Sequence, residues 1–113
     1  MSHHTDCIFC KILRQEIPAE IIASNDHVFV IKDRAPKAPF HFLIIPKKHI
    51  SDISSLTLDD TVIAAELLFM AQHLSKTIPG TQEFRLVSNN GSGVGQSVFH
   101  IHFHFLAGKK LEF

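Results

Sequence analysis

The sequence predicts an α+β domain in which a five-stranded antiparallel sheet carries one long helix and one short helix. Three observations support this class: five short runs of apolar, β-branched and aromatic residues, two stretches with apolar residues at helical spacing, and mostly short connections. The 113 residues suit one domain, residues 1–113, and 45% hydrophobic against 19% charged residues leaves enough apolar surface for a core.

The amino-terminal third is expected to hold a short helix followed by a hairpin. The helix should begin after Asp6, a residue type that caps helices, and end at about Arg14, before Pro18. Its apolar residues recur at helical spacing and are Ile8, Phe9, Ile12 and Leu13. The runs Glu20–Ser24 and His27–Asp33 are predicted strands, because a turn-favouring Asn-Asp pair lies between them.

The middle of the chain is expected to supply a third strand and the long helix. Strand His41–Ile45 follows a segment whose two prolines cannot continue a sheet, and it ends at Pro46. Thr57 is predicted to cap the long helix, with Asp60 at the third helical position as in a capping box. The helix should stop at Pro79-Gly80. Its apolar positions include Val62, Ile63, Leu67, Phe69, Met70, Leu74 and Ile78.

Two more strands are predicted near the carboxyl end, Phe84–Ser88 and Val98–Leu106, with a glycine-rich loop over Asn89–Ser97 between them. Connections this short favour antiparallel pairing. The long helix should then cover one face of the sheet.

The charge balance excludes several classes of partner. Eleven Lys and Arg balance eleven Asp and Glu, so no general attraction to nucleic acid or to an anionic membrane is expected. The longest apolar run, Leu67–Ala71, is far shorter than the roughly 20 residues of a membrane span, and the first thirty residues lack the apolar core of a signal peptide. A cytoplasmic location with reduced cysteines is expected.

Three histidines carry the strongest functional signal. His100, His102 and His104 alternate with Ile101, Phe103 and Phe105, so a strand here would place imidazoles on one face and apolar groups on the other. Neighbouring rings on that face would lie about 6.5–7 Å apart, a spacing that suits contacts to one phosphate or ligation of one metal.

The loop immediately upstream, Asn89–Ser97, contains three glycines whose backbone N–H groups can approach an anion closely. It is neither a Walker loop, which ends in Gly-Lys-Ser/Thr, nor a Rossmann fingerprint, because a predicted strand rather than a helix follows it. Together with the three histidines it indicates a phosphate site.

The segment Gly95–Leu106 resembles the signature of the histidine triad (HIT) family, His-φ-His-φ-His-φ-φ with φ apolar. The resemblance extends over nearly the whole chain and is carried further by Ile8-Phe9, Lys11-Ile12, Glu16–Ala19, Asp33, Ala38-Pro39 and His41–Ile50. Ser97 and the block His41–Ile50 resemble the Hint branch, the purine nucleoside phosphoramidases. His104 argues against the galactose-1-phosphate uridylyltransferases, which have Gln at that position.

The resemblance implies a mechanism through a nucleotidyl-histidine intermediate without a cofactor. His102 would be the nucleophile, with its proton held on Nδ1 by the backbone carbonyl of His100. His104 would stabilise the phosphate charge, Ser97 would relay a proton to the leaving nitrogen, and His41 would support the triad from behind.

The resemblance also implies a nucleotide pocket for a substrate of the AMP-amine type. Asp33 would accept hydrogen bonds from the ribose hydroxyls. The other positions that match the family are Ile8, Phe9, Ile12, Ile17 and Ile31 for the base, and Asn89, Gly95 and Gln96, together with Ser97, His102 and His104, for the phosphate and leaving group. Core packing is the alternative role for the aliphatic residues.

Cys7 and Cys10 have the spacing of half a zinc site at the start of a helix, and His49 and His100 could complete a tetrahedral set. A structural zinc is therefore expected, as in some bacterial members of the family. The alternatives are two small buried apolar residues and a redox pair, and the second lacks the preceding strand of a thioredoxin unit.

Three other functions stay open from the sequence: a nucleotide-binding regulatory module with slow turnover, a dinucleoside polyphosphate hydrolase, and a catalytic metal held by the three triad histidines. The resemblance further implies a homodimer in which the long helix and the strand Phe84–Ser88 meet their symmetry mates. The expected partners are therefore a purine nucleotide and a second copy of the chain.

Overall fold

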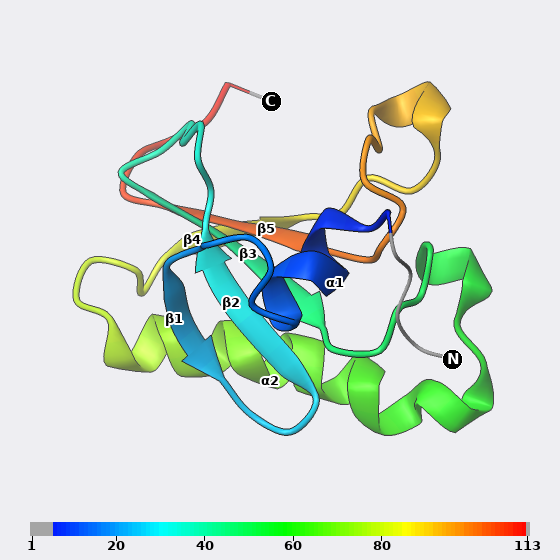
Figure 1. The fold of residues 1–113 in the computed structure, drawn as a ribbon. Helices are drawn as coiled ribbons and strands as arrows, with labels where there is room; N and C mark the ends of the chain where they lie inside the picture. Colours follow the sequence, from blue (N-terminus) through cyan, green and yellow to red (C-terminus); the bar gives the residue numbers. More distant parts are fainter. Residues whose placement is uncertain (1–5, 113) are drawn as a thin grey trace.

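The computed structural model describes residues 6–112 and confirms the predicted class (Figure 1). The α-helices are α1 (Ile8–Leu13) and α2 (Thr61–Thr77), and three short 3-10 turns are η1 (Ile53–Ser55), η2 (Leu58–Asp60) and η3 (Ser92–Val94). The strands are β1 (Ile21–Ser24), β2 (Val28–Lys32), β3 (Phe40–Pro46), β4 (Phe84–Val87) and β5 (Phe103–Ala107). They form one antiparallel sheet in the order β1-β2-β3-β5-β4.

The sheet has a core on each face, because its central strands are apolar on both sides. In β2, Val28 and Val30 pack on the side of α2, while Phe29 and Ile31 pack on the side of α1. Strand β3 alternates in the same way, with Phe42 and Ile44 toward α2 and Leu43 and Ile45 toward α1. Side chains of a strand point alternately to the two faces of the sheet, and helices cover both faces here. Almost every residue of these strands is therefore apolar, which explains the nearly continuous apolar runs in the sequence. Figure 1 shows α2 along one face and α1 over the other.

The predicted capping box is present, but it caps a 3-10 turn rather than the long helix itself. The Thr57 hydroxyl accepts from the backbone N–H of Asp59, and the Asp60 carboxylate accepts from the backbone N–H of Thr57 at 3.0 Å. The turn η2 then leads directly into α2. Lys48 donates to Asp60 at 2.7 Å and lowers the pKa of that carboxyl.

The predicted cap of the first helix was wrong. The N-cap is Cys7, whose sulfur accepts from the backbone N–H of Cys10 at 3.4 Å, and not Asp6. A thiol takes the place of the usual oxygen acceptor, so the two cysteines are held at the helix start by the helix's own hydrogen bonding.

The fifth strand starts later than predicted, at Phe103 instead of Val98. Strand β5 pairs with β3 only as far as Ile44 opposite Phe103, and β3 ends at Pro46, which has no N–H to donate. Residues 98–102 therefore leave the ladder, and the backbone N–H of Ile101 donates to the carbonyl of Ile50 instead. This departure gives His100 and His102 surroundings that a regular strand would not provide.

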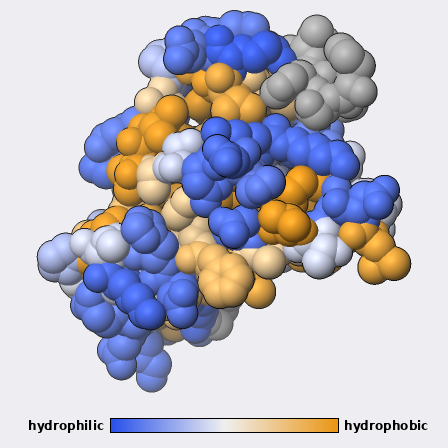
Figure 2. All heavy atoms as spheres, turned by 90° about the horizontal axis from the view of Figure 1, so that it is seen from below, coloured by the Kyte–Doolittle hydropathy of each residue, from blue (hydrophilic) through white to orange (hydrophobic). Residues whose placement is uncertain are grey.

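Across residues 6–112 no helix is both long enough and apolar enough to cross a bilayer. Figure 2 shows apolar side chains in patches between hydrophilic ones on the face seen from below.

Candidate active site and metal centre

A cavity of about 630 Å³ brings together ten of the twelve residues predicted to bind nucleotide. They are Ile8, Phe9, Ile12, Ile31, Asp33, Asn89, Gly95, Ser97, His102 and His104. The cavity lies on the α1 side of the sheet, between the start of that helix, β2 and the glycine-rich loop. Its volume falls in the range of small-molecule and cofactor pockets.

Two predicted residues lie outside this lining. Ile17 packs against the core beneath α1. Gln96 is buried, with only 4% of its surface exposed, and its side-chain amide bonds to backbone groups instead of facing the cavity. Sequence reasoning missed Lys37 and Val98, which do line it. No motif marks Lys37, whose relevant group is its backbone N–H.

The tautomer of His102 is set by a backbone carbonyl. Its Nδ1 lies 2.8 Å from the carbonyl oxygen of His100, and a carbonyl only accepts, so Nδ1 carries the proton. The other nitrogen, Nε2, then keeps its lone pair. The ring is half-buried, lines the cavity, and has Phe9 edge-on with centroids 5.1 Å apart. His102 thus has the protonation pattern of a nucleophilic imidazole.

A second chain of hydrogen bonds orients His104. The backbone N–H of Lys37 donates to His41 Nδ1 at 3.1 Å, so the proton of neutral His41 is on Nε2. That Nε2–H donates to His104 Nδ1 at 2.9 Å. Neutral His104 therefore carries its own proton on Nε2 and lines the same cavity as a hydrogen-bond donor.

Burial keeps both of these imidazoles neutral. It is the largest cause of the fall in the pKa of His104 to about 4, to which the neighbouring His102 and His41 contribute. The pKa of His41 is also lowered by burial, against the opposing pull of Asp33, whose carboxylate oxygen lies 3.4 Å from His41 Nε2. Near neutral pH the chain from Lys37 to His104 is uncharged, as the assigned tautomers require.

His100 points away from the cavity into a cluster with Cys7, Cys10 and His49. The four ligand atoms, two sulfurs and two imidazole nitrogens, all lie within 4.8 Å of one another. His100 Nδ1 is 3.2 Å from Cys7 Sγ and 3.7 Å from Cys10 Sγ, and His49 Nδ1 is 3.4 Å from Cys10 Sγ. Two sulfurs and two nitrogens are a common tetrahedral donor set for zinc.

The tautomer of His100 fits that donor set. Its Nε2 lies 2.8 Å from the carbonyl oxygen of Pro46, so Nε2 carries the proton and the Nδ1 lone pair faces the sulfurs. A backbone acceptor behind a ligand histidine is the usual arrangement at metal sites. Burial raises the pKa of the Cys7 thiol, which disfavours the reactive thiolate that a redox pair requires.

The structure rejects a single metal held by all three triad histidines. His100 belongs to the cysteine cluster, while His104 lies with Asp33 and His41 in a second group of close donor atoms. That second group does not suit a metal, because His41 Nε2 carries the proton that it donates to His104. His100 is separated from His104 because residues 98–102 lie outside the strand, and His100 there turns toward the cysteines.

Fold and site together define a small α+β domain with a histidine-lined, nucleotide-sized cavity on one face of its sheet. A family model described as HIT domain matches residues 14–111. An uncharacterized HIT-like protein of Synechocystis sp. is 44% identical over 104 residues, covering 92% of this chain and 91% of that protein. The chain therefore belongs to the HIT family.

Solved structures agree over nearly the full length. A HIT family hydrolase from Clostridium thermocellum superposes with a TM-score of 0.91 at 35% identity, covering 96% of this chain and 95% of that one. A histidine triad protein from Clostridium difficile gives a TM-score of 0.92 at 38% identity, covering 98% and 97%.

The lowered pKa of His104 predicts an acid-sensitive fold. Below about pH 6.5 the unfolded chain binds a proton at this histidine, whereas the folded chain binds it only near pH 4. The free energy of unfolding should therefore fall as the pH decreases from about 6.5 to about 4, and this contribution should be fully present above that range. Urea unfolding at several pH values, in wild type and His104→Gln, checks this. The variant should show a weaker pH dependence, and an identical dependence would contradict the assignment.

Proposed function

We propose that the protein hydrolyses the P–N bond of purine nucleoside 5′-phosphoramidates of the AMP-amine type through a nucleotidyl-histidine intermediate. One observation carries the proposal: the 2.8 Å contact between His102 Nδ1 and the His100 carbonyl. It keeps the proton on Nδ1, so that the lone pair of Nε2 is available on a residue that lines the cavity. An imidazole in this state is a competent nucleophile near neutral pH. Two solved relatives, from Clostridium thermocellum and Legionella pneumophila, are described as HIT family hydrolases.

In the first step His102 Nε2 attacks the α-phosphorus. A bond forms between Nε2 and phosphorus as the phosphorus–nitrogen bond breaks, and the leaving nitrogen takes up a proton that Ser97 relays from solvent, so that the amine departs. In the second step water attacks the same phosphorus, the Nε2–phosphorus bond breaks, and the water's proton leaves through Ser97. The products are the free amine and the nucleoside monophosphate, with His102 regenerated in its starting tautomer.

Charge that develops on the phosphoryl oxygens would meet donors on both sides. His104 offers its Nε2–H, held in that tautomer through His41 and Lys37. The loop offers the backbone N–H of Ser97, because the N–H groups of Gly95 and Gln96 already donate to the carbonyls of Ser92 and Gly91. Gly95 has φ +104°, a conformation that L side chains rarely adopt. Donors already oriented before the reaction stabilise the transition state most effectively.

The nucleoside would occupy the remainder of the cavity. The base would lie against the apolar side chains Ile8, Phe9, Ile12 and Ile31. Asp33 would accept from the ribose hydroxyls. One of its carboxylate oxygens accepts from the backbone N–H of Ala35 at 2.8 Å, which orients the carboxylate at the edge of β2.

His102→Ala should lower phosphoramidate turnover by about 10³-fold or more, because it removes the attacking atom. The measurement is AMP release from an adenosine phosphoramidate, with mass spectrometry of rapidly quenched wild type to detect the added nucleotidyl group on His102. His73→Ala, at an exposed histidine on α2, is the matched control and should keep wild-type activity.

The same assay separates the other functions. Tight AMP binding without turnover would favour the regulatory module. Faster cleavage of a diadenosine polyphosphate than of the phosphoramidate would favour the dinucleoside polyphosphate hydrolase. Absence of the adduct during turnover would contradict the proposed mechanism.

We also propose that Cys7, Cys10, His49 and His100 hold a structural zinc. Bound there, zinc would cross-link the start of α1 to the segment after β3 and to the segment before β5. Its contribution would be to stability and not to the chemistry, since the cluster faces away from the nucleotide cavity.

Elemental analysis of protein purified without chelator should find about one zinc per chain, and Cys10→Ser should abolish it and lower Tm by about 5 °C or more. His73→Ala should retain both the metal and Tm. Wild-type protein without zinc, unable to take it up from a stoichiometric solution, would contradict the site.

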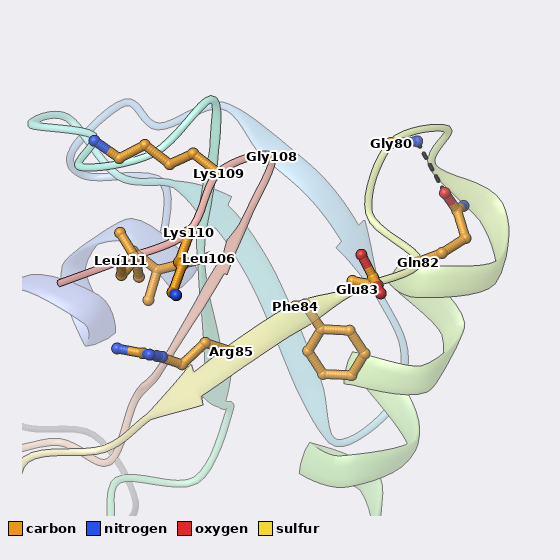
Figure 3. A pocket seen from close by; sticks show the side chains of 10 residues that line it. All are labelled: Gly80, Gln82, Glu83, Phe84, Arg85, Leu106, Gly108, Lys109, Lys110 and Leu111. Carbon is orange, nitrogen blue, oxygen red and sulfur yellow. Dashed lines mark hydrogen bonds between the residues drawn. The ribbon is translucent and has the colours of Figure 1, made fainter. Parts of the chain in front are cut away.

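Finally, we propose a homodimer that joins the open edges of β4. The apolar residues Val62, Leu68 and Phe69 of α2 are each more than half exposed, and Phe84 of β4 is 39% exposed. A cavity of about 650 Å³ lies between β4 and the carboxyl-terminal segment. Figure 3 shows side chains that line it, among them Phe84 and Arg85 of β4 and Lys110 and Leu111 of the carboxyl-terminal segment. An unpaired strand edge beside exposed apolar groups suits a two-fold contact.

Light scattering should give twice the chain mass for wild type and the single-chain mass for Phe69→Glu, because the new charge would be buried without a partner. Leu58→Glu, at a residue 92% exposed, is the matched control and should stay dimeric. A monomeric wild type at micromolar concentration would contradict the dimer.

A further inference from the structure

The buried side chain of Gln96 makes three hydrogen bonds to backbone groups. Its Oε1 accepts from the N–H of Gly91 at 2.7 Å, and its Nε2 donates to the carbonyls of Ser51 at 2.8 Å and Val98 at 3.1 Å. Gly91 lies near the start of the glycine-rich loop Asn89–Ser97, Val98 directly follows that loop, and Ser51 lies on the segment after β3. The loop Asn89–Ser97 is called the catalytic loop below. The amide therefore connects three backbone segments and does not reach into the nucleotide cavity.

Gln96 also closes the loop through its own backbone. Its N–H donates to the carbonyl of Gly91 at 3.1 Å, so Gly91 is bonded at both its N–H and its C=O by the same residue. The six residues from 91 to 96 thus form a ring whose two ends are fastened together. The short turn η3 lies inside this ring.

Packing does little to hold this ring. A Cβ built at Gly91, Gly93 or Gly95 would meet no atom within 4 Å, so open space lies beside all three positions. Glycine has the largest freedom of any residue, and here no neighbouring side chain restricts it. The conformation must therefore be held by hydrogen bonds, and Gln96 supplies three that are partly buried. Asn90 adds an exposed tie, accepting from the N–H of Ile53 at 2.7 Å.

We propose that Gln96 is a positioning residue that holds the catalytic loop in the geometry needed for the transition state. The inference rests on the proposed function, since the groups that Gln96 would place are the backbone N–H and the hydroxyl of Ser97, the next residue. Gln96 acts through these neighbours and does not touch the substrate. Its loss would let the loop shift, and a displacement of about 1 Å at donors of this kind can cost about 10²-fold in rate.

The test compares Gln96→Met and Gln96→Glu with Gln82→Met. Methionine removes all three bonds at similar length, whereas glutamate keeps the acceptor for Gly91 and loses the two donors. Gln82 is a matched control, because its side-chain amide also makes three hydrogen bonds to backbone, to Gly80, Ser75 and Ile78, but it lies at the end of α2. Phosphoramidate kcat and KM are measured together with Tm, below the unfolding transition of every variant.

Both Gln96 variants should lose about 10²-fold in kcat with KM within about threefold of wild type, because base and ribose contacts are unchanged. Gln82→Met should lower Tm without changing kcat. Gln96 variants that keep kcat within about threefold, or that lose only affinity, would overturn the positioning role. A wild type without turnover would instead contradict the proposed function, so the two failures are distinguishable.

Discussion

The geometry of this site depends on backbone groups that decide which nitrogen of each histidine carries the proton. The carbonyl of Pro46 accepts from His100 Nε2–H, and the carbonyl of His100 accepts from His102 Nδ1–H. The N–H of Lys37 donates to His41 Nδ1, which leaves the proton of that ring on Nε2. Backbone donors and acceptors do not titrate, so they fix which tautomer the neutral form of each ring adopts. Each ring is thereby given one role as a donor, an acceptor or a ligand.

His100 connects the two functional parts of the molecule. Its side chain belongs to the cysteine cluster, and its carbonyl orients the proposed nucleophile two residues later. This double use is available only because residues 98–102 run outside the ladder, where a ring can turn into the protein while its carbonyl faces the next histidine. The side chain of His100 thus belongs to the proposed structural site, whereas its carbonyl belongs to the proposed active site.

Neutrality is the second condition that the site meets. The chain has equal numbers of acidic and basic residues, so anion binding cannot rely on a general positive field. Burial keeps His104 and His41 uncharged, which makes them oriented hydrogen-bond donors and not cations. The loop adds the uncharged backbone N–H and hydroxyl of Ser97. Such donors act locally, and their value depends on being held in place before the substrate arrives.

The sequence alone determined the five strands and the two helices, because alternation of apolar residues and helical spacing are local signals. The resemblance to the HIT family predicted ten of the residues that line the cavity. Only the tertiary structure showed that Cys7 and not Asp6 caps α1, that His100 leaves the strand, and that Gln96 turns inward. The orientations of His100 and Gln96 depend on partners far along the chain, Pro46 for His100 and Ser51 for Gln96. Periodicity cannot report such contacts, since the competing hydrogen-bond partners are chosen when the strands and loops pack together.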